Sequence, residues 1–510
     1  MRETLRRGLV CGCLWLLLAA RGFCAPLVEN EIVGKPWFEA RTAHFRIFSC
    51  GPTQQVAKVG ARLEQFRQAY ATLAGAQAVE SPPIVVIAFP DRRSMVPFLP
   101  VYKGQPANLA AFFHRDSDEN FIALSLAGAG AEALEPIFHE YAHLLFRHNQ
   151  LIWPMWLNEG MADVYSTFEA DPYGVIIGKP MPTYLELLRN RQWMPLAELF
   201  KVTVKSPAYN ERDRQGIFYA ESWLLTHYLM LGDNALMKSR FRELTAHLKK
   251  GETPEQAFTN AMGVTAQQME NQLHAYLKRG RFQPLRLSIP SGLGSARAMS
   301  FRGLAPVEVR FRIGDMMMRI NRTGEAKAFF DDANRIAPKS PLPVEGLGLL
   351  AADQNDASEA VRMLETSINR GSMSFLTHYV YAQEKYFLTQ KKTDVFTKID
   401  SAAEAEIESE LLKAMRLMPD FAPAQELMGF LLMVQGHRLD EAEQHLRRAI
   451  QLEPENQGYL FTLAQVQMHR QNFAEARKTL EPLRVAASDP DLKKHAEELL
   501  RRIDKDQPSR

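Results

Sequence analysis

The sequence predicts an α+β domain followed by an all-α array of helix pairs. Segments with strand composition fall within the first 125 residues and give way to helical periodicity from Glu132 to about Gly280. Small residues then recur after Pro306 with a period of about 34 residues. A chain of 510 residues is long enough for roughly two to four domains. The net charge of +2 gives no electrostatic case for nucleic-acid binding.

Residues 1–25 are expected to be a secretory signal peptide. Arg2, Arg6 and Arg7 precede a short apolar run, Leu9 to Ala20, that falls below the roughly 20 residues of a membrane helix. No later segment of the sequence is apolar over such a length. The expected location is therefore periplasmic or secreted. The cleavage point stays open, as do a lipid anchor on Cys24 and an uncleaved segment that tethers the protein to a membrane.

Residues 26–283 are predicted to form the α+β domain, which begins with a small mixed sheet. Phe45–Ser49 and Ile84–Pro90 have strand composition, and the segment Gln54–Leu73 between them has helical periodicity. Leu109–Leu126 is predicted to be a hairpin, because a turn-forming run from Asp116 to Asn120 separates two apolar stretches. The remainder of the domain is predicted to be helical.

Residues 284–305 are rich in Pro, Gly and Ser and are predicted to connect this domain to the repeats in residues 306–505. An insertion of about 13 residues around Thr389 to Glu404 interrupts the repeat. The repeating positions are Gly314, Ala326, Phe330, Ala333 and Pro338, then Gly348, Ala360, Leu364 and Ser367, then Ala382, Ala414 and Pro419, then Gly429, Ala442, Leu446, Ala449 and Pro454, and finally Ala464, Ala476 and Leu480.

Small residues at these positions let two antiparallel helices pack closely, and a proline ends the second helix. The pattern resembles tetratricopeptide repeats (TPRs), about five of them, with a capping helix in "DPDLKKHAEELLRRI". This resemblance implies an all-α solenoid that docks a substrate or a protein partner. An irregular helical bundle is the alternative.

The segment "FHEYAHLLF" places two histidines and a glutamate in a helix that is otherwise apolar. Residues i and i+4 of a helix share one face, so His139 and His143 can direct two imidazoles at one ion. Glu140 points about a third of a turn away, where it can reach a water on that ion but cannot bind the ion itself. The alternative is an amphipathic helix that tolerates two histidines. The apolar neighbours argue against it, because two buried imidazoles and a carboxylate without partners are costly.

A second segment, "WLNEGMADVYS", contains a candidate for the third protein ligand that a zinc site would need. A catalytic zinc needs three protein ligands and one open position, and Glu159 follows His143 by 16 positions. Asp163 lies one helical turn beyond Glu159, where it can accept the other ring N–H of a ligand histidine. The alternative for both carboxylates is a solvated helix face.

"HEYAH" followed by "WLNEGMAD" resembles the gluzincin metallopeptidases, and the likeness extends over roughly residues 40–281. It implies a zincin-like α+β fold with one Zn²⁺ per chain held by His139, His143 and Glu159. It also implies that Glu140 is the general base, that Asp163 orients a ligand, and that Tyr219 donates to the oxyanion. A packed aromatic ring is the alternative for Tyr219.

The resemblance further implies that a peptide substrate pairs with an edge strand at Ala110–Phe113. The segment that binds a free amino terminus in the aminopeptidase branch is absent from the sequence, which favours an endopeptidase or an enzyme of narrow specificity. Three functions stay open: an exported zinc metallopeptidase with a docking array, an interaction scaffold whose peptidase domain is inactive, and a hydrolase of non-peptide amides.

Overall fold

The computed structural model describes residues 31–74, 84–102, 104–107, 109–116, 118–127, 131–147, 153–171, 173–203, 206, 209, 216–232, 235–288, 299–390, 397–454, 456–486 and 489–506. The expected signal peptide, with Cys24, lies outside these residues. Among the helices in this part of the chain, none combines the length and the apolar character that crossing a membrane requires.

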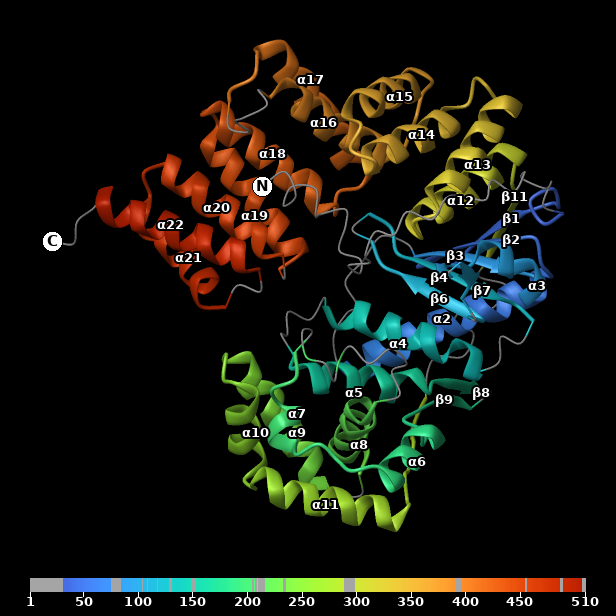
Figure 1. Ribbon diagram of the computed structural model, residues 1–510, viewed down its shortest axis with the longest axis vertical. Helices are drawn as coiled ribbons and strands as arrows, with labels where there is room; N and C mark the ends of the chain where they lie inside the picture. The colour runs from blue at the N-terminus through green and yellow to red at the C-terminus, as the bar shows by residue number, and fades with distance from the viewer. Residues whose placement is uncertain are drawn as a thin grey trace.

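A six-stranded mixed sheet forms the N-terminal part of the fold (Figure 1). Its strands in spatial order are β11 (Ser300–Gly303), β1 (Phe38–Arg41), β2 (Phe45–Ser49), β3 (Ile84–Phe89), β7 (Phe121–Ser125) and β6 (Ala111–His114). The strands β2, β3 and β7 run parallel, and the other neighbours pair antiparallel. The predicted strands and the predicted hairpin are confirmed, and β6 lies at the edge of the sheet.

Helices bury both faces of this sheet. They are α2 (Thr53–Ala74) and α4 (Ala131–Arg147) on one face, and α12 (Pro306–Arg319) and α13 (Thr323–Ile336) on the other. Val86 and Ile122 belong to the core beneath α2 and α4, whereas Val85 and Ile87 belong to the core beneath α12 and α13. Because alternate residues of a strand point to opposite faces, burial on both sides explains the uninterrupted apolar sequence of β3.

The helical part of the N-terminal region packs around α8 (Ile217–Leu231), which is apolar on nearly all sides. Its other helices are α5 (Met155–Ser166), α6 (Pro182–Asn190), α7 (Leu196–Leu199), α9 (Ala235–Lys249), α10 (Pro254–Met262) and α11 (Ala266–Arg279). The remaining elements are α3 (Arg92–Met95), η1 (Val96–Phe98), β4 (Val101–Tyr102), β5 (Gln105–Pro106), β8 (Glu169–Asp171), β9 (Gly174–Ile177) and β10 (Leu285–Leu287).

The segment predicted as a connection, residues 284–305, contains two of these strands. β10 pairs antiparallel with β9, and β11 pairs antiparallel with β1. Residues 289–298 lie outside the described part of the chain. The composition predicted turns, but an edge strand pairs through its backbone, and almost any residue can form these hydrogen bonds. The segment therefore adds an edge strand to each of two sheets.

Five helix pairs and a final helix follow. The pairs are α12 with α13, α14 (Pro341–Asp353) with α15 (Ala357–Asn369), α16 (Phe375–Thr389) with α17 (Ser401–Leu417), α18 (Ala422–Gln435) with α19 (Leu439–Leu452), and α20 (Gln457–His469) with α21 (Phe473–Ala486). The final helix is α22 (Pro490–Asp506). The helices follow one another in a curved array that begins on the sheet (Figure 1). The predicted solenoid is therefore present, with its insertion between α16 and α17.

Glycines at one repeat position explain the close packing within the pairs. The glycines, with the distance from an added Cβ to the nearest side-chain atom of the partner helix, are Gly314 to Phe330 at 2.6 Å, Gly348 to Leu364 at 2.7 Å and Gly429 to Leu446 at 2.8 Å. Protein interiors are packed too densely to admit a Cβ at such distances. The repeating small residues therefore report direct contact between the two helices of a pair.

Replacing Gly429 by valine is expected to lower the free energy of unfolding by about 1–3 kcal/mol, because the added atoms overlap Leu446 and the Ala442 carbonyl. Thermal unfolding followed by circular dichroism measures the effect. Gly324→Ala is the matched control, since an added Cβ at Gly324 meets nothing within 4 Å. An unchanged melting temperature for Gly429→Val would contradict the close approach of α18 and α19.

Buried ion pairs bind the first repeat to the sheet. The Arg319 side chain in α12 is 6% exposed, and its guanidinium donates to Asp116 at 3.0 Å, to Asp118 at 2.6 Å and to Asp315 at 3.1 Å. Asp116 and Asp118 lie in the turn between β6 and β7. The Arg319 guanidinium therefore joins the turn after the edge strand to the first repeat.

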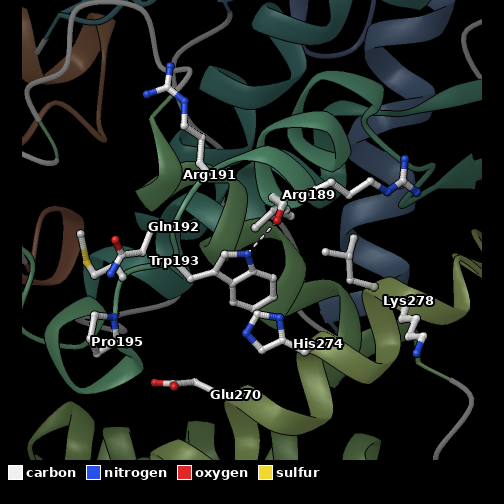
Figure 2. Close-up of a pocket in the computed structure, with 11 residues that line it drawn as sticks. Arg189, Arg191, Gln192, Trp193, Pro195, Glu270, His274 and Lys278 are labelled. Carbon is white, nitrogen blue, oxygen red and sulfur yellow. Dashed lines mark hydrogen bonds between the residues drawn. The ribbon is translucent and has the colours of Figure 1, made fainter.

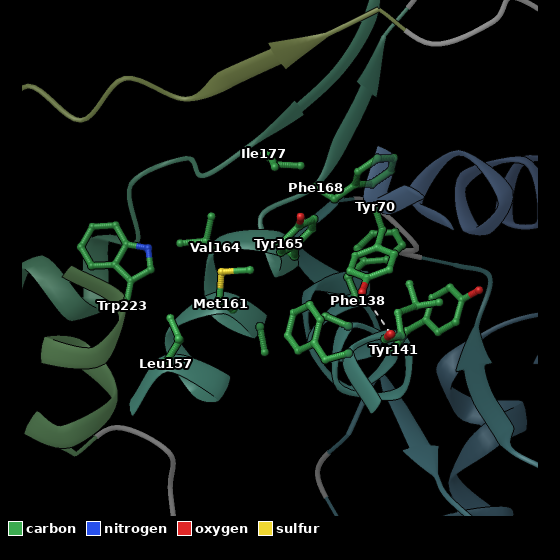
Figure 3. Close-up of a cluster of buried hydrophobic side chains, with 14 of the residues drawn as sticks. Tyr70, Phe138, Tyr141, Leu157, Met161, Val164, Tyr165, Phe168, Ile177 and Trp223 are labelled. Carbon is green, nitrogen blue, oxygen red and sulfur yellow. Dashed lines mark hydrogen bonds between the residues drawn. The ribbon is translucent and has the colours of Figure 1, made fainter. Parts of the chain in front are cut away.

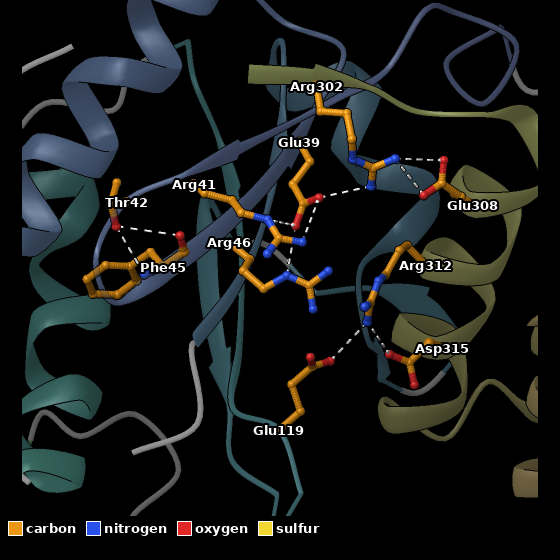
Figure 4. A network of polar contacts seen from close by, with 10 residues as sticks. All are labelled: Glu39, Arg41, Thr42, Phe45, Arg46, Glu119, Arg302, Glu308, Arg312 and Asp315. Atoms are coloured by element: carbon orange, nitrogen blue, oxygen red, sulfur yellow. Dashed lines mark hydrogen bonds and ion pairs between the residues drawn. The ribbon is translucent and has the colours of Figure 1, made fainter. Parts of the chain in front are cut away.

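A second polar network runs along the same face of the sheet (Figure 4). Glu39 in β1 is 1% exposed and accepts hydrogen bonds from Arg46 at 2.8 Å and from Arg302 of β11 at 2.9 Å. Burial raises the pKa of Glu39, but hydrogen bonds from Arg46, Arg41 and Arg302 lower it by more, to about 2. Arg312 of α12 pairs with Glu119 at 3.3 Å. Ion pairs thus accompany the apolar contact between the sheet and the first repeat.

Candidate metal centre

The helices α4 and α5 carry the candidate ligands, and an apolar cluster holds them together (Figure 3). Phe138 and Tyr141 of α4 lie in this cluster with Tyr165 of α5. Since these rings fix the rotation of α4, the next helical face, which bears His139 and His143, turns toward α5. Packing of the apolar residues therefore sets where the two imidazoles point.

The structure brings His139, His143 and Glu159 together, as the sequence predicts. The two Nε2 atoms lie 3.0 Å apart, and Glu159 Oε2 lies 3.3 Å from His139 Nε2 and 3.6 Å from His143 Nε2. Glu159 is 3% exposed and His139 is 5% exposed. Within the described residues, no second group of three His, Cys, Asp or Glu side chains converges in this way.

Further side chains orient the two imidazoles. Asp163 Oδ1 lies 2.9 Å from His139 Nδ1, which places Asp163 where the sequence predicts an orienting carboxylate. The Tyr184 hydroxyl donates to the other oxygen of Asp163 at 3.1 Å. Asn158 Oδ1 accepts from His143 Nδ1 at 3.3 Å. Both rings therefore keep their hydrogen on Nδ1 and direct the lone pair of Nε2 toward Glu159.

Two imidazole lone pairs and one carboxylate oxygen thus face one another in a buried space. Burial raises the pKa of Glu159, but His139 and His143 lower it by more when they are protonated, so the net shift is downward. A cation bound in their place would likewise favour the ionised carboxylate. Zinc–ligand distances of about 2.0–2.2 Å and tetrahedral angles place neighbouring donors roughly 3.3 Å apart. The observed separations of 3.0 to 3.6 Å fit one such ion.

Tyr219, the predicted oxyanion donor, uses its hydroxyl to donate to the backbone carbonyl of Tyr209 at 3.1 Å. The Tyr209 hydroxyl donates to the candidate ligand Glu159, at Oε1, over 3.3 Å. Sequence reasoning missed Tyr209, Asn158 and Tyr184. Asn158 precedes Glu159 directly and could have been found by its position, but no spacing rule connects Tyr209 or Tyr184 to the two motifs.

Glu140 lies on α4 between the two histidines and is partly buried. The edge strand β6 contacts the same helix, so the strand predicted to bind substrate packs against the helix that carries both histidines. In the described part of the chain, β6 pairs with β7 on one side and has no strand on the other. The helix that bears the predicted base therefore packs directly against the predicted edge strand.

A surface hollow of about 660 Å³ lies elsewhere, between the segment after α6 and the helix α11 (Figure 2). Trp193 and His274 stack at its centre with their ring centroids 3.9 Å apart. The charged ends of Arg189, Arg191 and Lys278 extend away from this pair of rings. None of the candidate metal ligands lines this hollow.

Comparison with known proteins identifies one family within the chain. The tetratricopeptide repeat model matches residues 433–503. No curated protein matches the chain.

Several solved structures resemble part of the chain. YrrB, a TPR protein with an unusual peptide-binding site, is 17% identical over 37% of this chain and 91% of its own, with a TM-score of 0.31. TTC0263, a TPR protein of Thermus thermophilus, is 21% identical over 38% of this chain and 98% of its own, with a TM-score of 0.29. PilF of Pseudomonas aeruginosa is 15% identical over 39% of this chain and 93% of its own, with a TM-score of 0.30. The family match establishes that the C-terminal region contains tetratricopeptide repeats.

Proposed function

We propose that the chain is a TPR scaffold for protein interaction that also carries a zinc-dependent peptide hydrolase site. The family match over residues 433–503 supports the scaffold role directly, because stacked repeats expose an extended surface that suits peptide or protein partners. The hydrolase role rests on the side chains of α4 and α5 and on the resemblance of their motifs to gluzincins.

One observation carries the hydrolase proposal: His139, His143 and Glu159 direct three acceptor atoms at one buried point. Such a set would hold one zinc ion and leave a position open for substrate or water. Zinc held there would supply Lewis acidity, which makes water nucleophilic near neutral pH. Asp163 and Asn158 would keep both imidazoles in the ligating tautomer.

Glu140 is the proposed general base. Its carboxylate would take a proton from the attacking water and pass it to the amine that leaves when the peptide bond breaks. A peptide that adds to the open edge of β6 would lie extended beside α4. The scissile bond of that peptide would then be brought to the side of α4 that bears Glu140.

Two alternatives keep the scaffold and change the chemistry. In one, the α+β domain is catalytically inactive and the TPR array is the functional part, which the family match supports more directly than it supports hydrolysis. In the other, the site hydrolyses a non-peptide amide. The proposed location, the periplasm or the cell exterior, rests on residues 1–25 alone. N-terminal sequencing of protein from a periplasmic fraction tests it, and an intact Met1 in a cytoplasmic fraction would refute it.

Metal removal tests the site. The purified chain is expected to contain about one zinc ion per molecule, to lose both the ion and the cleavage of a peptide library on dialysis against a chelator, and to regain both with zinc. His139→Ala is expected to bind no zinc after the same treatment, because one of three ligands is gone. His437→Ala, at an exposed histidine of the repeats, is the control and is expected to keep the ion.

The outcomes separate the functions. A wild-type chain that binds no zinc leaves only the scaffold. A chain that binds zinc, cuts no peptide and releases amine from a non-peptide amide supports the second alternative. A chain that binds zinc and cuts peptides supports the proposal, and the cleavage sites in the library then define its specificity.

A further inference from the structure

We propose that Tyr209 is a positioning residue that makes Glu159 bind the metal through one oxygen. The inference rests on the proposed zinc site and deepens it. Tyr209 stands 50 residues after Glu159 in the chain, yet its hydroxyl donates to Glu159 Oε1 at 3.3 Å. This contact is not part of the roles that the two sequence motifs imply.

The two oxygens of Glu159 have different surroundings. Oε2 lies 3.3 Å and 3.6 Å from the Nε2 atoms of His139 and His143, so it is the oxygen that completes the ligand set. Oε1 accepts the hydrogen bond from Tyr209. The lone pair of Oε1 that accepts this hydrogen bond is less available to a cation, so the contact favours ligation of the metal through Oε2 alone.

Tyr209 is itself held by α8. The Tyr219 hydroxyl donates to the Tyr209 carbonyl at 3.1 Å, and the two rings stack with centroids 6.2 Å apart and planes 28° apart. Tyr219 is 4% exposed and lies in a helix that is buried along most of its length. The backbone and the ring of Tyr209 are therefore both fixed by a rigid element, which is what an orienting hydroxyl requires.

The expected consequence is a defined coordination number. If both oxygens of Glu159 bound the ion, the carboxylate would occupy an additional coordination position next to the two imidazoles. A catalytic zinc needs that position for water or substrate. Tyr209 would thus protect the open position, and Tyr219 would act on the metal through Tyr209.

Tyr209→Phe tests this role, because it removes only the hydroxyl. We expect zinc affinity, measured by competition with a chromophoric chelator, to fall about 10- to 100-fold. We expect the visible absorption of the cobalt-substituted protein to weaken, since a two-oxygen carboxylate raises the coordination number above four. Tyr173→Phe is the matched control, because Tyr173 is 83% exposed, and it is expected to change neither reading.

Tyr219→Phe separates positioning from simple loss of structure. It is expected to weaken the visible absorption of the cobalt-substituted protein, as Tyr209→Phe does, but by less. The two variants are expected to have similar melting temperatures when free of zinc. Wild-type zinc affinity together with a wild-type cobalt spectrum in Tyr209→Phe overturns the proposal, whatever happens to hydrolysis. If the wild-type chain binds neither zinc nor cobalt, the proposed hydrolase site fails and this inference fails with it.

Discussion

Glu140→Gln is expected to abolish peptide hydrolysis while zinc stays bound. An amide has nearly the shape of a carboxylate but cannot accept a proton, so the general base is lost while the ligands His139, His143 and Glu159 are unchanged. General bases contribute factors of roughly 10² to 10⁴ to a rate, and the loss is expected to fall in that range or beyond it. Initial rates on a peptide identified from the library and zinc content of the same preparation measure both effects.

Glu135→Gln is the matched control for this prediction. Glu135 lies on the same helix, about one turn before His139, and is also partly buried. It is expected to keep both zinc and activity. Loss of zinc in Glu140→Gln would mean that Glu140 supports the ligand set, and full activity in Glu140→Gln would refute its role as the base. An inactive wild-type chain that binds zinc would instead favour the scaffold whose α+β domain does no chemistry.

Arg319→Ala is expected to destabilise the whole N-terminal region. Its guanidinium is shared by Asp116, Asp118 and Asp315 in a nearly buried position. Removing one partner of a buried ion pair costs about 3–5 kcal/mol, because the remaining charges lose their compensation. The melting temperature is expected to fall by roughly 5 °C or more, which differential scanning calorimetry measures.

Arg335→Ala provides the comparison on the neighbouring helix. The Arg335 side chain is 75% exposed and pairs with Asp332, so its loss is expected to cost less than about 1 kcal/mol. Equal melting temperatures for Arg319→Ala and Arg335→Ala would contradict the buried cluster. Since Asp116 and Asp118 follow the end of the edge strand β6, Arg319→Ala is also expected to raise hydrogen exchange in β6.

The position of α12 explains why the two regions depend on each other. Val309 and Ile313 of α12 share one core with Val85 and Ile87 of β3. A truncation after residue 305 would remove the helices that cover this face and leave its apolar side chains in water. The first repeat is therefore a structural layer that covers one face of the sheet, and it anchors the array that follows to the α+β region.

The amino-acid sequence by itself determined the features that depend on short-range geometry. A spacing of four on a helix was enough to place His139 and His143 on one face, and one further turn was enough to connect Glu159 with Asp163. The hairpin that makes β6 an edge strand followed from its turn residues in the same way. The period of small residues predicted the solenoid, because each glycine at the repeating position lets the two helices of its own pair approach closely.

Only the tertiary structure decided the contacts between distant segments. Nothing in the spacing connects Tyr209 to Glu159, Tyr184 to Asp163, or Arg319 to the β6–β7 turn. The Pro-, Gly- and Ser-rich segment before the repeats likewise gave no sign of β10 and β11. A local pattern predicts which face of a helix or strand a residue occupies, but the residue that it contacts across that face depends on how whole helices and sheets pack. Edge strands are held by backbone hydrogen bonds, which depend little on the amino-acid composition of the strand.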